Sequence, residues 1–275
     1  KYQYNETYRF DWVPNNGSYT LSVENVEGDI IVNGHQGRGI EMYIEHKIHA
    51  KTEKRAKRFV EQNKINVYHI DNNLIQIKSD EKMKHRRNGS IIFNLDLPNK
   101  IQLKLETLGG NINVKHIQGE LYLKTNGGDI ELKNLSGRID AKTSGGDIEI
   151  GSVEGLVLTH TSGGNIEVKH SEGQFNASTF GGDMGFQYLT GNVKAQTSGG
   201  SITLKNISGT TISARSAGGN IRAENVVADI NCITSDGQII LENINGNADV
   251  SASSGDIKID EMTGSIICYT YGGDI

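Results

Sequence analysis

The feature that most constrains the fold of this chain is a glycine pair that returns at a fixed interval after residue 107. The pair, or an Asp-Gly or Ser-Gly in its place, recurs every 18 residues, with a single interval of 19. The second glycines of these pairs are Gly110, Gly128, Gly146, Gly164, Gly182, Gly200, Gly219, Gly237, Gly255 and Gly273. Further glycines stand midway between them, so the repeating unit is a nine-residue half-repeat used in two alternating versions.

Each half-repeat has the pattern of a short strand followed by a turn. In residues 128–133, Ile130 and Leu132 alternate with charged residues, which is the two-residue period of a strand with one buried face. Residues 138–143 alternate in the same way. Glycine at each corner is expected to supply the positive φ of a tight turn. One 18-residue coil therefore contains two strands and two corners.

Stacked coils can bury an apolar face that a single coil cannot, with each strand pairing in parallel with the equivalent strand one coil further on. Stacking predicts columns of similar residues at the interval of the repeat. An apolar column begins Ile112, Ile130, Ile148, Ile166, and a hydroxyl column begins Thr107, Thr125, Thr143, Thr161. The sequence therefore predicts an all-β fold, a parallel two-sheet β-solenoid of the β-helix or β-roll kind with about ten coils. Its one extra residue is expected near Arg215.

Residues 1–100 do not follow the repeat throughout, and we interpret them as an α+β cap on a solenoid that occupies residues 101–275. Residues 17–40 show the strand–turn–strand pattern and predict a first coil separated from the others. A short helix is expected over residues 52–60, with Thr52 as its N-cap. Strands are expected at 40–50, 65–70, 74–78 and 91–97.

Three features of the sequence together resemble a known family. They are the string NVEGDIIVNG at residues 25–34, the helical interruption, and the repeated units typified by TSGGDIEI at residues 143–150. With these features the chain resembles the bacterial putative-adhesin family of β-strand-repeat proteins over essentially its whole length. The resemblance implies a β-solenoid exported to the cell envelope or surface. It supplies no catalytic motif to carry over.

The charge is unevenly distributed along the chain. Residues 1–100 carry 16 Lys/Arg and 13 Asp/Glu, a net of +3, whereas residues 101–275 carry 12 and 20, a net of −8. A net-acidic body argues against nucleic acid as the main partner, because phosphate binding needs a basic face. No apolar run approaches the length of a membrane span, about 18 residues.

The two cysteines fall in one predicted column. Val250 stands between Cys232 and Cys268, so their separation should be about 9–10 Å, beyond the reach of a disulfide. Two buried free thiols are expected.

Metal sites receive little support from the spacing of possible ligands. Asp129, Asp147, Asp183 and Asp274 directly follow a second glycine, but the second Gly-x-Asp element of a calcium-binding β-roll is lacking. Stabilisation of the turns by Asp and Asn is the favoured role. His46 and His49 should point to opposite faces of a strand, and His116 and His170 lie three coils apart. Surface histidines are expected, with no metal ion and no cofactor.

Catalysis is also weakly supported. Coils of constant length leave little room for the loops on which β-helix enzymes place their catalytic residues. An outward column of Glu131, Glu149 and Glu167 runs beside a column that includes Lys115, Lys133, Lys169 and Lys205. These columns should compensate one another as a solvated charged face, and no catalytic residue is predicted.

Two groups of residues are candidates for binding. The basic stretch 82–87, with Lys84, Arg86 and Arg87, could meet an anionic polymer or lipid surface, although a solvated loop is the simpler interpretation. Leu156 and Leu158 should point outward on one strand, with Tyr122 two coils away, as a contact patch for a partner or a second copy. Scattered surface apolar residues are common, and this alternative stays open.

The favoured function is that of a non-enzymatic, extracytoplasmic protein of the cell envelope or surface, a putative adhesin that presents an extended surface to a glycan or protein. An envelope-associated scaffold or sensor that acts through protein–protein contacts is the first alternative, and a polysaccharide-acting β-helix enzyme is the second. The sequence stops inside a repeat at Ile275. We therefore expect more chain to follow, or the open edge to pair with another strand, which includes edge-to-edge self-association.

Overall fold

The computed structural model describes residues 1–10, 19–71, 73–79 and 89–275. Of the described residues, 71% lie in strands and 4% in helix, and the strands include a β-solenoid of about nine turns. The predicted fold class is therefore confirmed. Two compact units divide the chain, residues 1–138 and residues 139–275. The predicted domain boundary near residue 100 stays a prediction.

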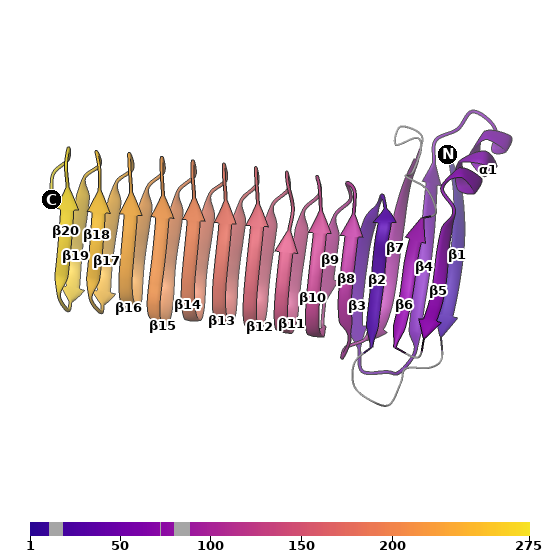
Figure 1. Ribbon diagram of the computed structural model, residues 1–275, viewed down its shortest axis with the longest axis horizontal. Coiled ribbons are helices and arrows are strands. Elements are labelled where there is room, and N and C mark those ends of the chain that lie inside the picture. Colours follow the sequence, from indigo (N-terminus) through magenta and orange to yellow (C-terminus); the bar gives the residue numbers. More distant parts are fainter. Residues whose placement is uncertain (11–18, 72, 80–88) are drawn as a thin grey trace. The chain divides into compact units, whose positions relative to one another are not determined.

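The C-terminal unit is built from consecutive strands that stack side by side (Figure 1). Its strands are β12 Ile148–Thr161, β13 Ile166–Thr179, β14 Met184–Thr197, β15 Ile202–Ser216, β16 Ile221–Thr234, β17 Ile239–Asn245, β18 Ala248–Ala252, β19 Ile257–Thr263 and β20 Ile266–Thr270. Equivalent residues of adjacent coils pair in parallel, as Ile148 with Ile166 and Ile166 with Met184. The predicted apolar columns are buried, so each coil adds one layer to a continuous core.

The midway corner bends the chain through a non-glycine residue with positive φ, which in most coils is followed three residues later by a glycine with positive φ. In β13 these are His170, at 50°, and Gly173, at 137°. A non-glycine residue occupies the first of these positions in every such coil, at Ser152, His170, Tyr188, Asn206, Asn225, Asn243 and Glu261. Asparagine tolerates this conformation best, and Asn225 and Asn243 each donate a side-chain hydrogen bond to the asparagine one coil earlier. This column was not predicted from the sequence.

At the Gly-Gly corner the expected reason for glycine is wrong. Gly182 does not have a positive φ. Instead, a Cβ atom there would lie 1.9 Å from the carbonyl oxygen of Gly164. The second glycine of each pair is therefore required because the backbones of adjacent coils approach too closely for a side chain, and not because of its φ.

The buried hydroxyl column ties each coil to the previous one. Thr197 Oγ1 donates to the carbonyl of Gly182 at 3.0 Å and accepts from the amide of Gly200 at 3.2 Å. Thr161, Thr179 and Thr234 make the same pair of bonds. The column therefore satisfies backbone groups that would otherwise be buried without partners.

The N-terminal unit contains parallel strand pairs like those of the solenoid coils, and in addition a helix and antiparallel strands. Its elements are β1 Tyr2–Phe10, β2 Thr20–Val26, β3 Asp29–His35, β4 Ile40–Ile48, α1 Glu53–Gln62, β5 Ile65–Asp71, β6 Leu74–Ser79, β7 Gly89–Pro98, β8 Gln102–Thr107, β9 Ile112–Lys115, β10 Gln118–Thr125 and β11 Ile130–Lys142, of which the last extends past residue 138. The predicted helix and its Thr52 cap are confirmed, since Thr52 Oγ1 accepts from the amide of Arg55.

The first coil is distant in sequence but adjacent in space to the repeat. Strand β2 pairs in parallel with β8, and β3 with β9. On their other side, β2 pairs with β6 and β3 with β7. The antiparallel pairs β7–β4, β4–β1 and β6–β5 follow outward. The chain excursion between β3 and β8 thus adds strands beyond the first coil, as expected of a cap.

His46 does not lie on the surface, and that prediction is wrong. Its side chain is 0% exposed on the inner face of β4, and Nε2 lies 3.1 Å from Glu6 Oε1 on β1. Desolvation lowers the pKa of His46 below its usual value, although the contact with Glu6 opposes the shift. The ring is therefore held neutral in the folded protein.

We expect the N-terminal unit to lose stability as pH falls below about 6.5. Below that pH His46 becomes protonated in the unfolded chain, whereas the buried ring stays neutral in the folded protein. This stabilisation is fully present above that pH and is lost on acidification, at up to about 1.4 kcal/mol per pH unit. Hydrogen exchange of the β1, β4 and β7 amides at pH 7 and 5.5 measures it. His46→Phe should weaken the pH dependence, whereas His49→Phe, at an exposed histidine, should retain it. Equal pH dependence in both variants would contradict the assignment.

The cysteine prediction is confirmed in its main part. Cys232 pairs with Val250, and Val250 pairs with Cys268, so the two thiols lie two coils apart and are free. Cys232 is buried, but Cys268 is only partly buried. Burial raises the pKa of the Cys232 thiol to about 12, which makes it unreactive.

Candidate functional site

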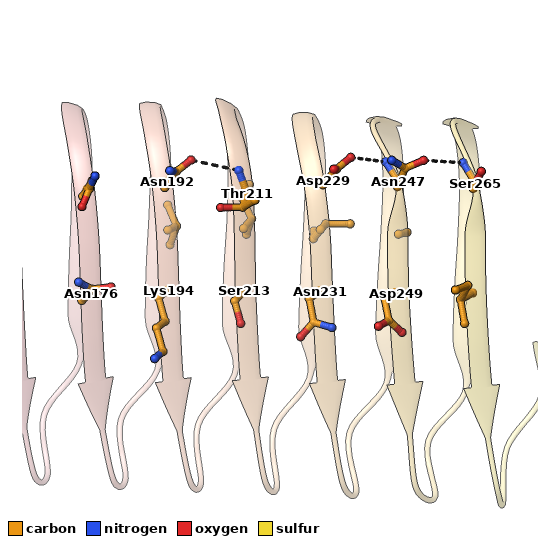
Figure 2. Close-up of a pocket in the computed structure, with 16 residues that line it drawn as sticks. Asn176, Asn192, Lys194, Thr211, Ser213, Asp229, Asn231, Asn247, Asp249 and Ser265 are labelled. Carbon is orange, nitrogen blue, oxygen red and sulfur yellow. Dashed lines mark hydrogen bonds between the residues drawn. The ribbon is translucent and has the colours of Figure 1, made fainter.

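A polar groove of about 790 Å³ lies on the outward face of the second half-coils of the C-terminal unit (Figure 2). It crosses strands β13 to β16, β18 and β20. Most of the residues that line it stand two apart on each strand and therefore share the outward face, while the buried residues Val193, Ile212, Ile230 and Ala248 between them form its floor. Because equivalent residues of adjacent coils pair, the outward positions form two rows along the stack.

We name the rows by what their side chains do. The capping row consists of Gln174, Asn192, Thr211, Asp229, Asn247 and Ser265, and the open row consists of Asn176, Lys194, Ser213, Asn231, Asp249 and Ile267. Figure 2 shows the capping row above the open row.

Side chains of the capping row accept hydrogen bonds from backbone amides of the next coil and so hold the coils together. Asp229 Oδ1 accepts from the backbone amide of Asn247 at 2.8 Å, and Asn247 Oδ1 accepts from the amide of Ser265 at 3.1 Å (Figure 2). Asn192 Oδ1 accepts from two amides, those of Thr210 and Thr211, at 3.1 and 3.0 Å. These side chains therefore satisfy backbone donors that the turn between half-coils leaves unpaired.

The extra residue of the repeat lies inside this groove and not near Arg215. The register between β14 and β15 shifts between Thr190 and Val193, and that between β15 and β16 shifts between Ser208 and Thr211. The shift places a β-bulge around Thr210. The bulge presents two adjacent amides where other coils present one, which explains why Asn192 accepts both.

The open row has polar groups that the fold does not use. The side chains of Asn176, Lys194, Ser213 and Asp249 make no hydrogen bond or ion pair with any other residue that the structure describes. Asn231 Oδ1 accepts one bond, from Arg215 Nη2 at 3.3 Å. The row therefore offers amide, ammonium, hydroxyl and carboxylate groups at regular intervals to a molecule outside the chain.

The predicted binding residues occupy different places. Leu156 and Leu158 are half-buried on β12, where they pair with Gln174 and Asn176. The leucine pair thus adjoins the first residues of both rows. Tyr122 is half-buried on β10 of the N-terminal unit and pairs with Lys104. Lys84, Arg86 and Arg87 lie outside the described residues, and a binding role for any of these six stays a prediction.

The groove was missed because its signal is only a pair of outward polar columns. The open row can be found in the sequence by taking every eighteenth residue from Asn176 and allowing for the extra residue. Nothing in that list shows which polar columns cap backbone amides and which remain unpaired. That difference appears only when the register between coils is known.

The outward columns of the first half-coils form the predicted compensated charged face. Lys169 lies 2.5 Å from Glu167, and Lys205 lies 3.1 Å from Glu224. In the N-terminal unit, the hydrogen bond from Lys133 lowers the pKa of Glu131. An ionised, lysine-paired glutamate is poorly suited to donate a proton as a general acid.

The turn aspartates accept hydrogen bonds from backbone amides, which agrees with the turn-stabilising role favoured from the sequence. Asp147 Oδ1 accepts from the amide of Asn165 at 2.7 Å, and Asp183 Oδ1 accepts from the amide of Ser201 at 2.7 Å. Among the residues that the structure describes, no group of three or more His, Cys, Asp or Glu side chains could hold a metal ion. A search of the same residues finds no helix long and apolar enough to cross a membrane.

A comparison with protein families matches residues 158–275 to Toastrack DUF4097. No curated protein matches the chain. Among solved structures, a putative adhesin from Bacteroides fragilis NCTC 9343 is similar, with 13% identity, 99% of this chain and 97% of that chain covered, and a TM-score of 0.32.

Two further solved structures have comparable similarity. A putative lipid binding protein from Parabacteroides distasonis ATCC 8503 has 15% identity, coverage of 98% and 96%, and a TM-score of 0.35. A putative cell adhesion protein from Clostridium sporogenes ATCC 15579 has 11% identity, coverage of 94% and 100%, and a TM-score of 0.32. At these identities and TM-scores, the descriptions of the neighbours are not transferred to this chain.

Proposed function

We propose a function from the groove itself, because the match of residues 158–275 to Toastrack DUF4097 assigns no function to the chain. We propose that this chain is a non-enzymatic binding protein of the cell envelope or surface whose groove holds a neutral oligosaccharide. The observation that carries the proposal is that Asn176, Lys194, Ser213 and Asp249 of the open row make no side-chain hydrogen bond or ion pair with any residue the structure describes. Water hydrates these exposed groups in the free protein, and the hydroxyl groups of a ligand can replace that water and keep the hydrogen bonds.

The chemistry of the open row matches that of sugar hydroxyls. A hydroxyl group both donates and accepts, and so does the amide of Asn176, while Lys194 only donates and Asp249 only accepts. Mixed donors and acceptors therefore suit a ligand that carries many hydroxyl groups. With about 4.8 Å between strands, the four steps from Asn176 to Asp249 span about 19 Å. This length favours a chain of sugars over a single sugar.

The charge of the groove favours a neutral ligand. Lys194 is opposed by Asp249 in the open row and by Asp229 in the capping row. A polymer with a charge on every unit would meet both signs along this path, and binding would gain little from electrostatics.

The same two carboxylates give little support to hydrolysis. A glycosidase needs one carboxyl that keeps its proton near neutral pH, which ordinarily requires shielding from water. Asp229 and Asp249 are both exposed, and Asp229 already accepts a backbone amide. The proposed extracytoplasmic location rests on the family resemblance of the sequence.

A matched pair of tryptophan variants tests the groove. Ser213 and Thr203 are both half-buried, outward residues of β15, but only Ser213 lines the groove. A glycan array should first identify a neutral oligosaccharide ligand, and calorimetry should then measure its affinity. We expect Ser213→Trp to weaken binding at least tenfold by filling the groove, and Thr203→Trp to bind like the parent protein. Equal affinities for the two variants, or an array without a neutral glycan ligand, would contradict the proposal.

A further inference from the structure

A second concave site, separate from the oligosaccharide groove, lies in the N-terminal unit. A cavity of about 510 Å³ opens between the end of β4 and helix α1. Among the residues that the structure describes, its lining contains four basic side chains, His49, Lys51, Arg55 and Arg58, and no acidic side chain. A one-sign cavity of this kind concentrates ligands of the opposite charge.

The helix directs its cations into the cavity through its periodicity. Arg55, Arg58 and Gln62 stand three and four residues apart on α1 and so lie along one face. The adjacent face carries Ala56 and Phe59, which pack on Ile48. Burial of that apolar face fixes the rotation of α1 and thereby turns the arginine face toward His49 and Lys51.

The cations of the cavity are not neutralised by the fold. The side chains of Lys51, Arg55 and Arg58 make no ion pair with any residue in the described part of the chain, and all three are exposed. On the same helix, by contrast, Lys57 lies 2.9 Å from Glu53 and outside the cavity. The uncompensated charge is therefore concentrated where the surface is hollow.

The cavity also has an apolar wall, made by Ile48, Ala50 and Phe59. Ile48 is 1% exposed and Phe59 is 8% exposed, so both belong to the core, and only a small apolar area, completed by the half-buried Ala50, faces the cavity. A ligand that fits both parts carries an anionic head and a short apolar segment next to it.

From this arrangement we propose that the cavity binds a phosphate monoester that carries an apolar substituent. Two guanidinium groups can each contact phosphate oxygens in the bidentate geometry that arginine favours, and the ammonium of Lys51 adds a third positive charge. A dianionic head group is attracted more strongly to three or four cations than a carboxylate with a single negative charge is. The wall formed by Ile48, Ala50 and Phe59 accounts for the apolar substituent.

Hexyl phosphate is the soluble probe, and calorimetry of the full chain at low salt is the measurement. We expect Arg55→Gln and Arg58→Gln each to weaken binding at least tenfold, because each removes a charge-assisted contact. Lys54→Gln is the matched control, since Lys54 is an exposed cation of the same helix that does not line the cavity. It should change the affinity less than threefold. Inorganic phosphate should bind more weakly than hexyl phosphate, because it leaves the apolar wall uncovered.

Sedimentation with vesicles distinguishes the two possible ligands that carry a phosphate monoester, a lipid head group and a soluble phosphate ester. Binding to vesicles that contain phosphatidic acid, and not to phosphatidylcholine vesicles, assigns a lipid head group if Arg55→Gln abolishes it and Lys54→Gln does not. Hexyl phosphate binding without vesicle binding assigns a soluble phosphate ester. Equal losses in Lys54→Gln and Arg55→Gln would show a general charge effect and overturn the proposal. So would the absence of binding to both hexyl phosphate and phosphatidic acid.

Discussion

Gly182→Ala is expected to disrupt the stack around β13 to β15, whereas Gly181→Ala leaves it nearly unchanged. A Cβ at Gly182 would lie 1.9 Å from the carbonyl oxygen of Gly164 and 2.4 Å from its carbonyl carbon. A Cβ at Gly181 would meet its nearest atom, the carbonyl oxygen of Gly163, only at 3.7 Å. The two glycines are neighbours in one turn, so the comparison isolates the close approach between coils.

The expected loss for Gly182→Ala is about 4 kcal/mol or more in the free energy of unfolding of the C-terminal unit. The large value follows because the clashing atoms belong to the backbone and cannot rotate away, so two paired coils must separate. Hydrogen exchange of the β13 to β15 amides, with urea unfolding of the whole chain, measures the effect. If Gly181→Ala were as damaging as Gly182→Ala, conformational freedom and not close approach would explain the pair.

Thr197→Val is expected to lower the free energy of unfolding of the same unit by about 2–4 kcal/mol. Valine keeps the shape of threonine but leaves the carbonyl of Gly182 and the amide of Gly200 without their hydroxyl partner. Thr197 is 3% exposed, so water cannot replace that partner without opening the turn. Each backbone group that loses its partner costs about 1–3 kcal/mol when it is buried.

Two further variants at equivalent positions control this prediction. Thr197→Ser should be mild, because Ser216 naturally makes both bonds in its own coil, each at 2.8 Å. Ala252 interrupts the column with a methyl group, so Ala252→Thr should raise the free energy of unfolding by about 1 kcal/mol. Hydrogen exchange at Gly200 and Gly255 reports on the two sites. A Thr197→Val protein as stable as Thr197→Ser would contradict the role given to the hydroxyl.

The sequence predicted the coil closely because its two-residue and eighteen-residue periods act together. The period of two assigns Ile130 and Leu132 to the inside, and the period of 18 assigns Ile148 and Ile166 to the same column. Few folds satisfy both periods, since only stacked parallel strands bring equivalent residues into contact. For the same reason, the spacing of Cys232 and Cys268 was sufficient to predict free thiols.

The cap and the functional residues were less predictable because they depend on contacts that no period describes. His46 stands in the inward register of β4 between Ile44 and Ile48, but histidine is fully buried less often than isoleucine. Its partner Glu6 comes from the neighbouring strand β1, which is distant in sequence. The cationic face of α1 is visible in the sequence, but the apolar wall beside it is brought there by β4. Such contacts join segments whose separation follows no repeat.

The sequence by itself determined that this protein is a β-solenoid, which positions of its repeated coils are buried, and where each coil turns. Only the tertiary structure decided why the turn glycines are glycine, and which outward polar residues are free to bind. Gly182 and Asn176 are the examples: a Cβ at Gly182 would meet the backbone of the preceding coil, and the side chain of Asn176 makes no hydrogen bond with any residue the structure describes. Inward or outward direction follows from local alternation, but the distance between coils is a property of the stacked backbone.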